Sequence, residues 1–379
     1  MQNSISRHVP ELDGLRGVAI IAVIIHHHLT PFSLAGGFLG VDLFFVLSGF
    51  LITSLLLTEF DRTKTISLRK FYMRRVLRLG PALFLYLLAC LLVTYHTQLL
   101  EITREVRLIA IALVYLTNWR MAFGWDPSLD PTAIIWSLSI EEQFYLVWPL
   151  LLCACLALKL RRRFIIAGLV LVIVAVMAHR NSLLNTGASL TRLYYGTDTR
   201  ADAPLMGCLL ALFPMTAVGA WARRSLNLAG VLSAAALLYL IGTSSFSNQF
   251  LYRGGYTAVA LLAGIVILIA ANSPPWILAV TLQLRPLRWF GQISYGLYLW
   301  HWLVVRSTSF YYLGYWEPWA RLALAVGIAS ASFYLVEQPF NQLKSRFAIR
   351  PAEARSDSKA APRVEPDNTV PTLGVTVAN

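Results

Sequence analysis

Residues 11–32 read ELDGLRGVAIIAVIIHHHLTPF, and this stretch decides the class of the fold. Arg16 opens an apolar run that ends in three histidines, of which His27 is the second. On a helix the eleven residues from Arg16 to His27 make about three turns, so both side chains lie on nearly one face, about 16 Å apart along the axis. Because an ionisable group at membrane depth is costly, it marks a functional site.

The composition is that of an integral membrane protein. Hydrophobic residues make up 57% of the 379 residues and charged residues only 13%, whereas soluble domains carry about 25% charged residues. Because backbone polar groups in lipid must be satisfied within the segment, the long apolar runs predict an all-α integral membrane protein. The net charge of +13 is spread over short loops. A positive-inside bias explains it, so no nucleic-acid partner is expected.

The apolar segments are candidate spans, and they lie at 17–35, 37–58, 79–97, 106–120, 136–158, 164–180, 204–220, 228–245, 255–272, 289–310 and 319–337. The segment 106–120 is too short to cross comfortably, and without it every strongly basic loop lies on one side. We therefore predict a bundle of about ten transmembrane helices plus one short non-spanning helix, in the cell (inner) membrane, with both termini cytoplasmic. Residues 1–345 are the membrane domain, and 346–379 have the composition of a disordered cytoplasmic tail.

His27 is the candidate general base, because it shares a helix face with Arg16. A neutral imidazole there can take a proton from a hydroxyl group at near-neutral pH. The alternative is a core histidine that is hydrogen-bonded to a neighbouring helix. Arg16 alone would be an ordinary anchor at the inner edge of the membrane.

A basic stretch, FYMRRVLRLGP at 71–81, carries the candidate donor site. Arg75 and Arg78 are three residues apart, and Arg74 and Arg78 are four apart, so each pair shares a helix face. Guanidinium groups bind phosphate bidentately, which suits a phosphorylated cytoplasmic ligand. Positive-inside anchoring is the alternative.

Two apolar segments contain carboxylates. Asp42 interrupts the hydrophobic stretch at 37–53, and Glu141 and Glu142 stand together in WSLSIEEQFYLVWP at 136–149. Neighbouring residues diverge on a helix, so at most one of the two glutamates should line the interior. We expect Asp42 to face polar groups inside the bundle and Glu141 to lie toward the outer side.

Further candidates lie in the second half of the chain. In RLYYGTDTRADAPLMG at 192–207, Asp198 and Arg200 lie on the predicted outer side, where a simple surface salt network with Asp202 is the alternative. The last two spans hold a second set of candidates, namely Tyr295, His301 and Glu337. Most other aromatic residues near span ends fit an interface belt.

In this order the motifs resemble the acyltransferase-3 family of membrane O-acyltransferases, over about residues 8–345. The matching stretches are DGLRG with Arg16 and His27, GVDLFFVLSGF at 40–50, RRVLRLGP at 74–81, SLSIEEQFYLVWP at 137–149, YYGTDTRAD at 194–202, ISYGLYLWHW at 293–302 and VEQPF at 336–340. The resemblance implies ten spans, cytoplasmic acetyl-CoA as donor substrate, and a carbohydrate or glycolipid acceptor on the far side. It places Arg16 and His27 in the essential motif and Glu337 at a carboxylate of the last span. Since the chain stops soon after that span, the stand-alone type without a fused esterase-like domain is expected.

The residues and the resemblance together predict a membrane O-acyltransferase whose partners are acyl-CoA, membrane lipid and the acceptor. The predicted catalytic residues are His27, Arg16, Glu141 and Asp42. The predicted donor-binding residues are Arg74, Arg75 and Arg78. The predicted acceptor-binding residues are Asp198, Arg200, Tyr295, His301 and Glu337.

No metal and no permanently bound cofactor is expected. Direct transfer and an acyl-histidine intermediate both stay open, as do acetyl against longer acyl groups. The alternative function is a transporter or a flippase of a sugar-linked lipid, with the intramembrane charges along its pathway. The paired broken helices typical of many transporters are not found in the sequence.

Overall fold

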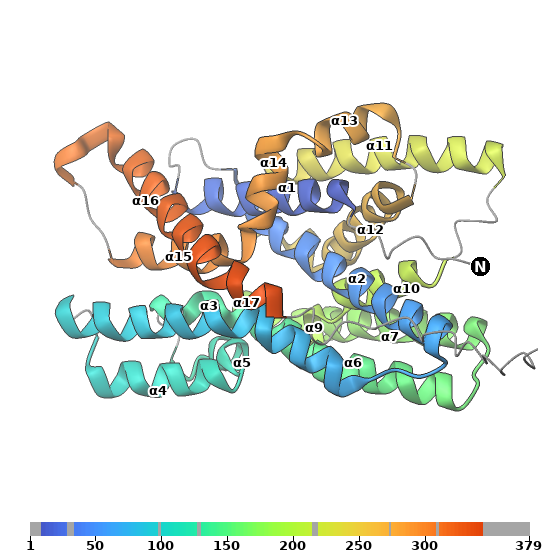
Figure 1. Cartoon of the computed structure of the whole chain (residues 1–379), viewed down its shortest axis with the longest axis horizontal. Coiled ribbons are helices and arrows are strands. Elements are labelled where there is room, and N and C mark those ends of the chain that lie inside the picture. Colours follow the sequence, from blue (N-terminus) through green and yellow to red (C-terminus); the bar gives the residue numbers. More distant parts are fainter. Residues whose placement is uncertain are drawn as a thin grey trace, which may run out of the picture. The chain divides into compact units, whose positions relative to one another are not determined.

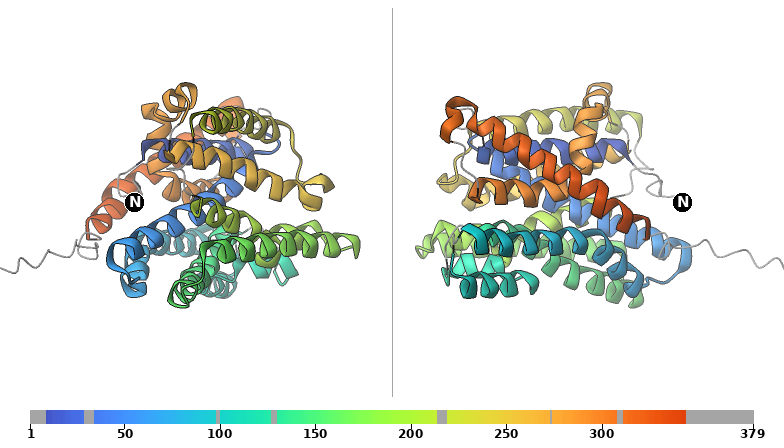
Figure 2. Two further views of the ribbon diagram at one scale, coloured as in Figure 1. Left: turned by 90° about the vertical axis from the view of Figure 1, so that its right-hand side faces the viewer. Right: turned by 60° about the vertical axis from the view of Figure 1, so that its left-hand side comes forward.

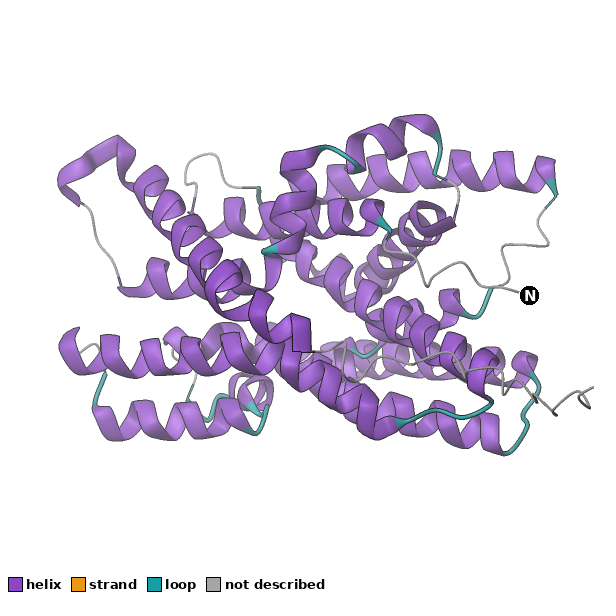
Figure 3. Ribbon diagram, in the orientation of Figure 1, coloured by secondary structure: helices purple, strands orange, loops and turns teal. Residues whose placement is uncertain are grey.

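The computed structural model describes residues 9–28, 34–97, 100–126, 130–213, 219–272, 274–307 and 311–343. Only helices and loops occur within these ranges (Figure 3). The elements in chain order are α1 Pro10–His28, η2 Gly37–Leu39, α2 Gly40–Thr63, α3 Leu68–Thr97, α4 Ile102–Leu113, α5 Thr117–Phe123, η3 Pro131–Ile134, α6 Ile135–Ala157, α7 Arg162–Asn185, α8 Leu190–Tyr195, α9 Thr197–Arg200, α10 Asp202–Ala211, α11 Ala220–Thr243, η5 Leu251–Gly255, α12 Tyr256–Asn272, α13 Trp276–Leu282, α14 Arg285–Gln292, α15 Ser294–Ser307, η6 Tyr311–Trp316, α16 Glu317–Ser332, η7 Phe333–Glu337 and α17 Gln338–Leu343. The all-α prediction is confirmed, and the tail predicted at 346–379 lies outside the described residues.

The helices gather on two sides of α2 (Figures 1 and 2). Helices α3 to α7 lie on one side, and α1 and α11 to α16 lie on the other. Helix α2 slants between them and packs along α10, and it also contacts α1, α12 and α6. Helix α1 is crossed by α14 and packs against α15. The histidine end of α1 thus meets α15, which comes from near the end of the chain.

Glycines allow the closest of these contacts. A Cβ on Gly49 of α2 would lie 1.9 Å from the carbonyl oxygen of Pro204, and one on Gly207 of α10 would lie 2.1 Å from that of Val46. Helix association in membranes relies on such close backbone approach. The α2–α10 contact therefore requires glycine at both positions.

Within the described residues, seven helices are long and apolar enough to cross a membrane. They are Gly37–Thr63, Leu68–Thr97, Pro131–Ala157, Arg162–Asn185, Trp221–Thr243, Leu251–Asn272 and Leu313–Leu343. Helices α4 and α5 form an eighth if the pair is one broken span, but they are bent by 113°. This bend, with Tyr115 at φ 54°, agrees with the prediction that no straight span crosses at 106–120.

The predicted count of about ten spans is not confirmed. Helix α1, expected to span at 17–35, begins with charged residues inside its first two turns. In the segment 204–220, helix α10 ends at Ala211, and residues 214–218 lie outside the described residues. The segment 289–310 is divided between α14 and α15 at Ile293. Charged residues in α1 and the break at Ile293 interrupt the apolar stretch, a feature that hydropathy averaged over the segment conceals.

Candidate functional site

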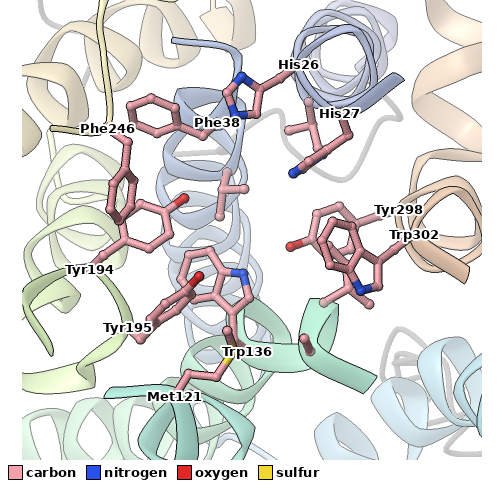
Figure 4. A pocket seen from close by; sticks show the side chains of 14 residues that line it. His26, His27, Phe38, Met121, Trp136, Tyr194, Tyr195, Phe246, Tyr298 and Trp302 are labelled. Atoms are coloured by element: carbon pink, nitrogen blue, oxygen red, sulfur yellow. The ribbon is translucent and has the colours of Figure 1, made fainter. Parts of the chain in front are cut away.

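The end of α1 opens into a cavity of about 170 Å³ that is walled by aromatic rings. His27 points into this space, and Trp136, Tyr194 and Tyr298 face it from three other helices (Figure 4). The aromatic cavity, as we call it, is lined by Val23, His26, His27, Phe38, Val41, Met121, Ala133, Ile134, Trp136, Tyr194, Tyr195, Phe246, Tyr298 and Trp302. Apart from the two histidines, none of these side chains is ionisable at neutral pH.

The three consecutive histidines have different surroundings. His26 lines the cavity, but its Nδ1 donates to the carbonyl oxygen of Leu34 at 2.9 Å. His28 is buried and is not among the residues that line the cavity. His27 lines the cavity and contacts Trp302, with ring centroids 5.3 Å apart. The preference for His27 from its spacing therefore agrees with its position.

His301 lies behind His27 rather than in the cavity. It is fully buried on α15, and its Nε2 lies 3.4 Å from His27 Nδ1. Its Nδ1 donates to the carbonyl oxygen of Leu297 at 3.0 Å. The sequence placed His301 among the acceptor-binding residues, but the structure gives it no surface on the aromatic cavity within the described residues.

Arg16 lies in a second, smaller cavity that adjoins the first. This inner cavity measures about 50 Å³ and shares Val41 and Tyr298 with the aromatic cavity. It is lined by Arg16, Val41, Phe44, Phe45, Ser137, Leu138, Glu141, Ser294, Tyr295 and Tyr298. The predicted common face of Arg16 and His27 thus faces two adjoining cavities.

Glu141 lies beside Arg75 and lines the inner cavity. Its carboxylate accepts from Ser48 Oγ at 3.0 Å and from the hydroxyl of Tyr145 at 3.1 Å, and Arg75 Nη2 lies 3.9 Å away. Glu142 instead accepts from Arg75 Nε at 3.0 Å and does not line the cavity. Only one of the two glutamates lines the interior, as predicted. Position 141 is one and a half turns inside α6, so it reaches the depth of the arginine on α3.

The three arginines of α3 do not form one fork. Arg74 pairs with Glu59 at 3.5 Å, while Arg75 pairs with the two glutamates of α6. Arg78 makes no hydrogen bond or ion pair within the described ranges, and Arg16 is the charged group that acts on it most strongly. The helical spacing predicts that these arginines share a helix face, but acidic residues on α2 and α6 form ion pairs with Arg74 and Arg75. Arg16 and Arg78 remain as adjacent cations.

Tyr295 and Glu337 lie near this cationic pair. Tyr295 lines the inner cavity and donates its hydroxyl to the carbonyl oxygen of Leu79 at 3.1 Å. Glu337 is buried on η7, and Arg78 and Arg16 are the cations that act on it. A Cβ on Gly296 would lie 2.6 Å from its Oε1, so glycine in the SYG motif admits this carboxylate. Tyr295 thus lines the inner cavity, whereas Glu337 is not among its lining residues.

Asp42 and Arg200 form a buried ion pair outside both cavities. Arg200 Nη2 lies 2.8 Å from Asp42 Oδ1, both side chains are 1% exposed, and the guanidinium lies 3.8 Å from the ring centroid of Tyr256. Asp202 pairs with Arg180 at 2.9 Å, also in the interior. Asp42 thus faces polar groups inside the bundle, as predicted, but neither it nor Arg200 touches the space around His27.

Asp198 is held at the end of α7 and not in the site. It pairs with Arg192 at 2.5 Å and with His179 at 2.9 Å. Burial raises the pKa of Asp198, but hydrogen bonds from Arg192 and His179 outweigh it and lower the pKa below its ordinary value. The alternative, a surface salt network of Asp198, Arg200 and Asp202, does not form, because each residue has a different partner.

Several residues of the site were missed in the sequence. Tyr298 lines both cavities, and its hydroxyl lies 2.6 Å from Ser137 Oγ. Trp136 and Tyr194 form the wall opposite His27 (Figure 4). All of them lie inside the motifs, but aromatic residues near span ends were assigned to an interface belt.

Known proteins resemble this chain over most of its length. The family model described as "Acyltransferase domain", the acyltransferase-3 family, matches residues 9–337. Peptidoglycan O-acetyltransferase OatA of Listeria monocytogenes is 37% identical over 358 residues, which cover 89% of this chain and 56% of that protein. O-acetyltransferase OatA of Staphylococcus aureus is 35% identical over 352 residues, with 89% and 58% covered.

The chain spans a little over half the length of these curated relatives. No solved structure shows a significant match. Since the family model covers nearly the whole of the described sequence, the chain belongs to the acyltransferase-3 family.

Proposed function

We propose that this chain is a membrane O-acyltransferase that moves an acetyl group from cytoplasmic acetyl-CoA to a hydroxyl group of a cell-surface or secreted carbohydrate or glycolipid. The observation that carries the proposal is the position of His27 in the aromatic cavity, next to an inner cavity that contains Arg16. The names of the relatives agree with an O-acetyl group and a sugar polymer.

The donor is assigned to the inner cavity because of its charge. Arg16 lines this cavity, and a guanidinium group suits the phosphates of coenzyme A. Arg78 does not line it, but Arg16 is the charged group that acts on Arg78 most strongly. Arg75 is engaged by Glu141 and Glu142, so it organises the site more than it offers a free charge. The thioester end of the donor would then extend past Tyr298 toward His27.

The acceptor is assigned to the aromatic cavity. Aromatic rings bind the apolar faces of sugar rings, and a few polar groups fix the orientation, as is usual in ligand sites. Here those polar groups are the histidines and the hydroxyls of the lining tyrosines. An acceptor hydroxyl in this space lies next to the imidazole of His27.

The reaction balances with His27 as the general base. The acceptor oxygen forms a bond to the acyl carbon while His27 takes the hydroxyl proton. The carbon–sulfur bond then breaks, and the same proton passes from His27 to the leaving coenzyme A sulfur. The products are the acetyl ester and free coenzyme A.

A strain that lacks the gene tests this function. Mild base releases O-acetate from envelope carbohydrate, and mass spectrometry reads the glycans. We expect the deletion strain to make the same glycans without O-acetate, and the wild-type gene but not His27→Ala to restore the ester. Loss of the glycan itself from the surface would instead support the transporter or flippase. Glycans with unchanged O-acetate would contradict the proposal.

A further inference from the structure

The buried contact between His27 and His301 fixes which ring nitrogens carry protons. His301 Nδ1 lies 3.0 Å from the carbonyl oxygen of Leu297, one turn earlier on α15. A carbonyl oxygen can only accept, so Nδ1 of His301 carries a hydrogen. In a neutral imidazole the other nitrogen then has a lone pair and accepts. His301 Nε2 is therefore an acceptor.

The lone pair on His301 Nε2 faces His27. The two atoms His301 Nε2 and His27 Nδ1 lie 3.4 Å apart, so the hydrogen between them belongs to His27 Nδ1. A neutral His27 with hydrogen on Nδ1 leaves Nε2 with a lone pair. Figure 4 shows the ring of His27 reaching into the aromatic cavity, where an acceptor hydroxyl would lie.

We propose that His301 is a positioning residue that holds His27 in the tautomer whose Nε2 receives the acceptor proton. This inference rests on the proposed acyl transfer and adds a role that the acceptor-binding assignment of His301 did not include. Tautomers of a histidine base are commonly set by the hydrogen bond of the second nitrogen. Here the partner of His27 is the neutral ring of His301, which is itself held by its hydrogen bond to the carbonyl oxygen of Leu297.

Packed rings around His27 and His301 hold the two side chains in place. His301 is fully buried, and its ring centroid lies 5.3 Å from that of His27, 5.7 Å from Tyr298 and 5.8 Å from His28. Helix α15 packs directly against α1. Rotation of the His301 ring would break its bond to Leu297, so the acceptor stays directed at His27.

The proton balance is consistent with this role. When His27 Nε2 takes the hydroxyl proton, the ring becomes an imidazolium, and its Nδ1–H bond to His301 becomes charge-assisted and stronger. The same proton leaves from Nε2 to the coenzyme A sulfur, and His27 returns to its starting tautomer. His301 keeps its own hydrogen on Nδ1 throughout.

The tautomer is measured without any activity by ¹⁵N NMR of the full chain labelled at histidine. The chain has seven histidines, so the His27 signals are identified by their loss in His27→Gln. We expect wild-type His27 to have hydrogen on Nδ1 and none on Nε2, and His301→Phe to lose this preference. A wild-type His27 with hydrogen on Nε2 would overturn the inference.

Transfer of label from [¹⁴C]acetyl-CoA in membranes supplies the second readout. His301→Phe keeps a ring but has no nitrogen that could accept a hydrogen bond from His27. We therefore expect kcat to fall about a hundredfold with KM for acetyl-CoA unchanged. His301→Gln restores an acceptor and should stay within about tenfold of wild type. The matched control is His96→Phe at the exposed end of α3, which should transfer at nearly the wild-type rate. A wild-type rate for His301→Phe would contradict the positioning role of His301. Absence of transfer in wild-type membranes would instead contradict the proposed function. The NMR result would then decide the tautomer of His27 by itself.

Discussion

The hydroxyl of Tyr298 and the Oγ of Ser137 lie 2.6 Å apart, at the place where the two cavities meet. Tyr298 lines both cavities, whereas Tyr195 lines only the aromatic one and Tyr295 only the inner one. A donor that enters from the inner cavity must pass this ring to reach His27. We therefore expect the Tyr298–Ser137 contact to control how much of an acyl chain fits at the junction.

Removing the ring of Tyr298 should widen the choice of donor. We expect Tyr298→Ala to raise the rate with butyryl-CoA relative to acetyl-CoA by about tenfold, since one or two methylenes in a pocket are worth that much. The ratio is measured in membranes with labelled acyl-CoA donors. Tyr195→Ala is the control, because it leaves the junction intact. An unchanged ratio in Tyr298→Ala would rule out this ring as the determinant of chain length.

Loss of Asp42 should destabilise the protein. Asp42→Asn leaves Arg200 buried and charged without its partner, and such changes cost about 3–5 kcal/mol. The melting temperature in detergent measures the effect, and Asp42→Asn with Arg200→Gln should recover part of it. Asp198→Asn is the control, because its pair is a third exposed and should cost about 1 kcal/mol or less. Equal melting temperatures for Asp42→Asn and wild type would contradict a structural role.

Substitutions of the three α3 arginines should have different effects. We expect Arg78→Ala to raise KM for acetyl-CoA about tenfold, because a guanidinium without a hydrogen-bond or ion-pair partner among the described residues is available to phosphate. Arg74→Ala, which removes the partner of Glu59, should leave KM nearly unchanged. Arg75→Ala should chiefly lower the melting temperature, because it leaves Glu141 and Glu142 without their cation. Equal KM values for Arg78→Ala and wild type would remove Arg78 from the donor site.

The α2–α10 contact should not tolerate a methyl group. Gly207→Ala places a Cβ 2.1 Å from the carbonyl oxygen of Val46, so the two helices must move apart. We expect a strong loss of folded protein in membranes, measured by fluorescence-detected size exclusion. Gly168→Ala on α7 is the matched control, because nothing lies within 4 Å of its Cβ. Similar yields of the two variants would mean that the contact is loose.

Much of the site follows from local patterns in the sequence. The spacing of Arg16 and His27 predicts a common helix face, and the structure places each in one of two adjoining cavities. The adjacency of Glu141 and Glu142 predicts that one of them faces inward, and Glu141 does. Such statements hold because helical geometry alone decides them.

Relationships between distant segments do not follow from local patterns. Nothing near Asp42 indicates that its partner is Arg200, 158 positions later. The three α3 arginines diverge because Glu59 and α6 supply acidic partners, which helical spacing does not reveal. The count of about ten spans is not confirmed, because averaged hydropathy does not reveal the charged residues at the start of α1 or the break at Ile293.

The most direct measurement is transfer of label from [¹⁴C]acetyl-CoA to base-labile ester in membranes that hold equal amounts of folded wild type, His27→Gln and His28→Gln. We expect His27→Gln to lose at least about a hundredfold in rate, the usual contribution of a general base, while His28→Gln stays near wild type. Wild-type transfer by His27→Gln would contradict the account, because no other ionisable group except His26 lines the aromatic cavity within the described residues.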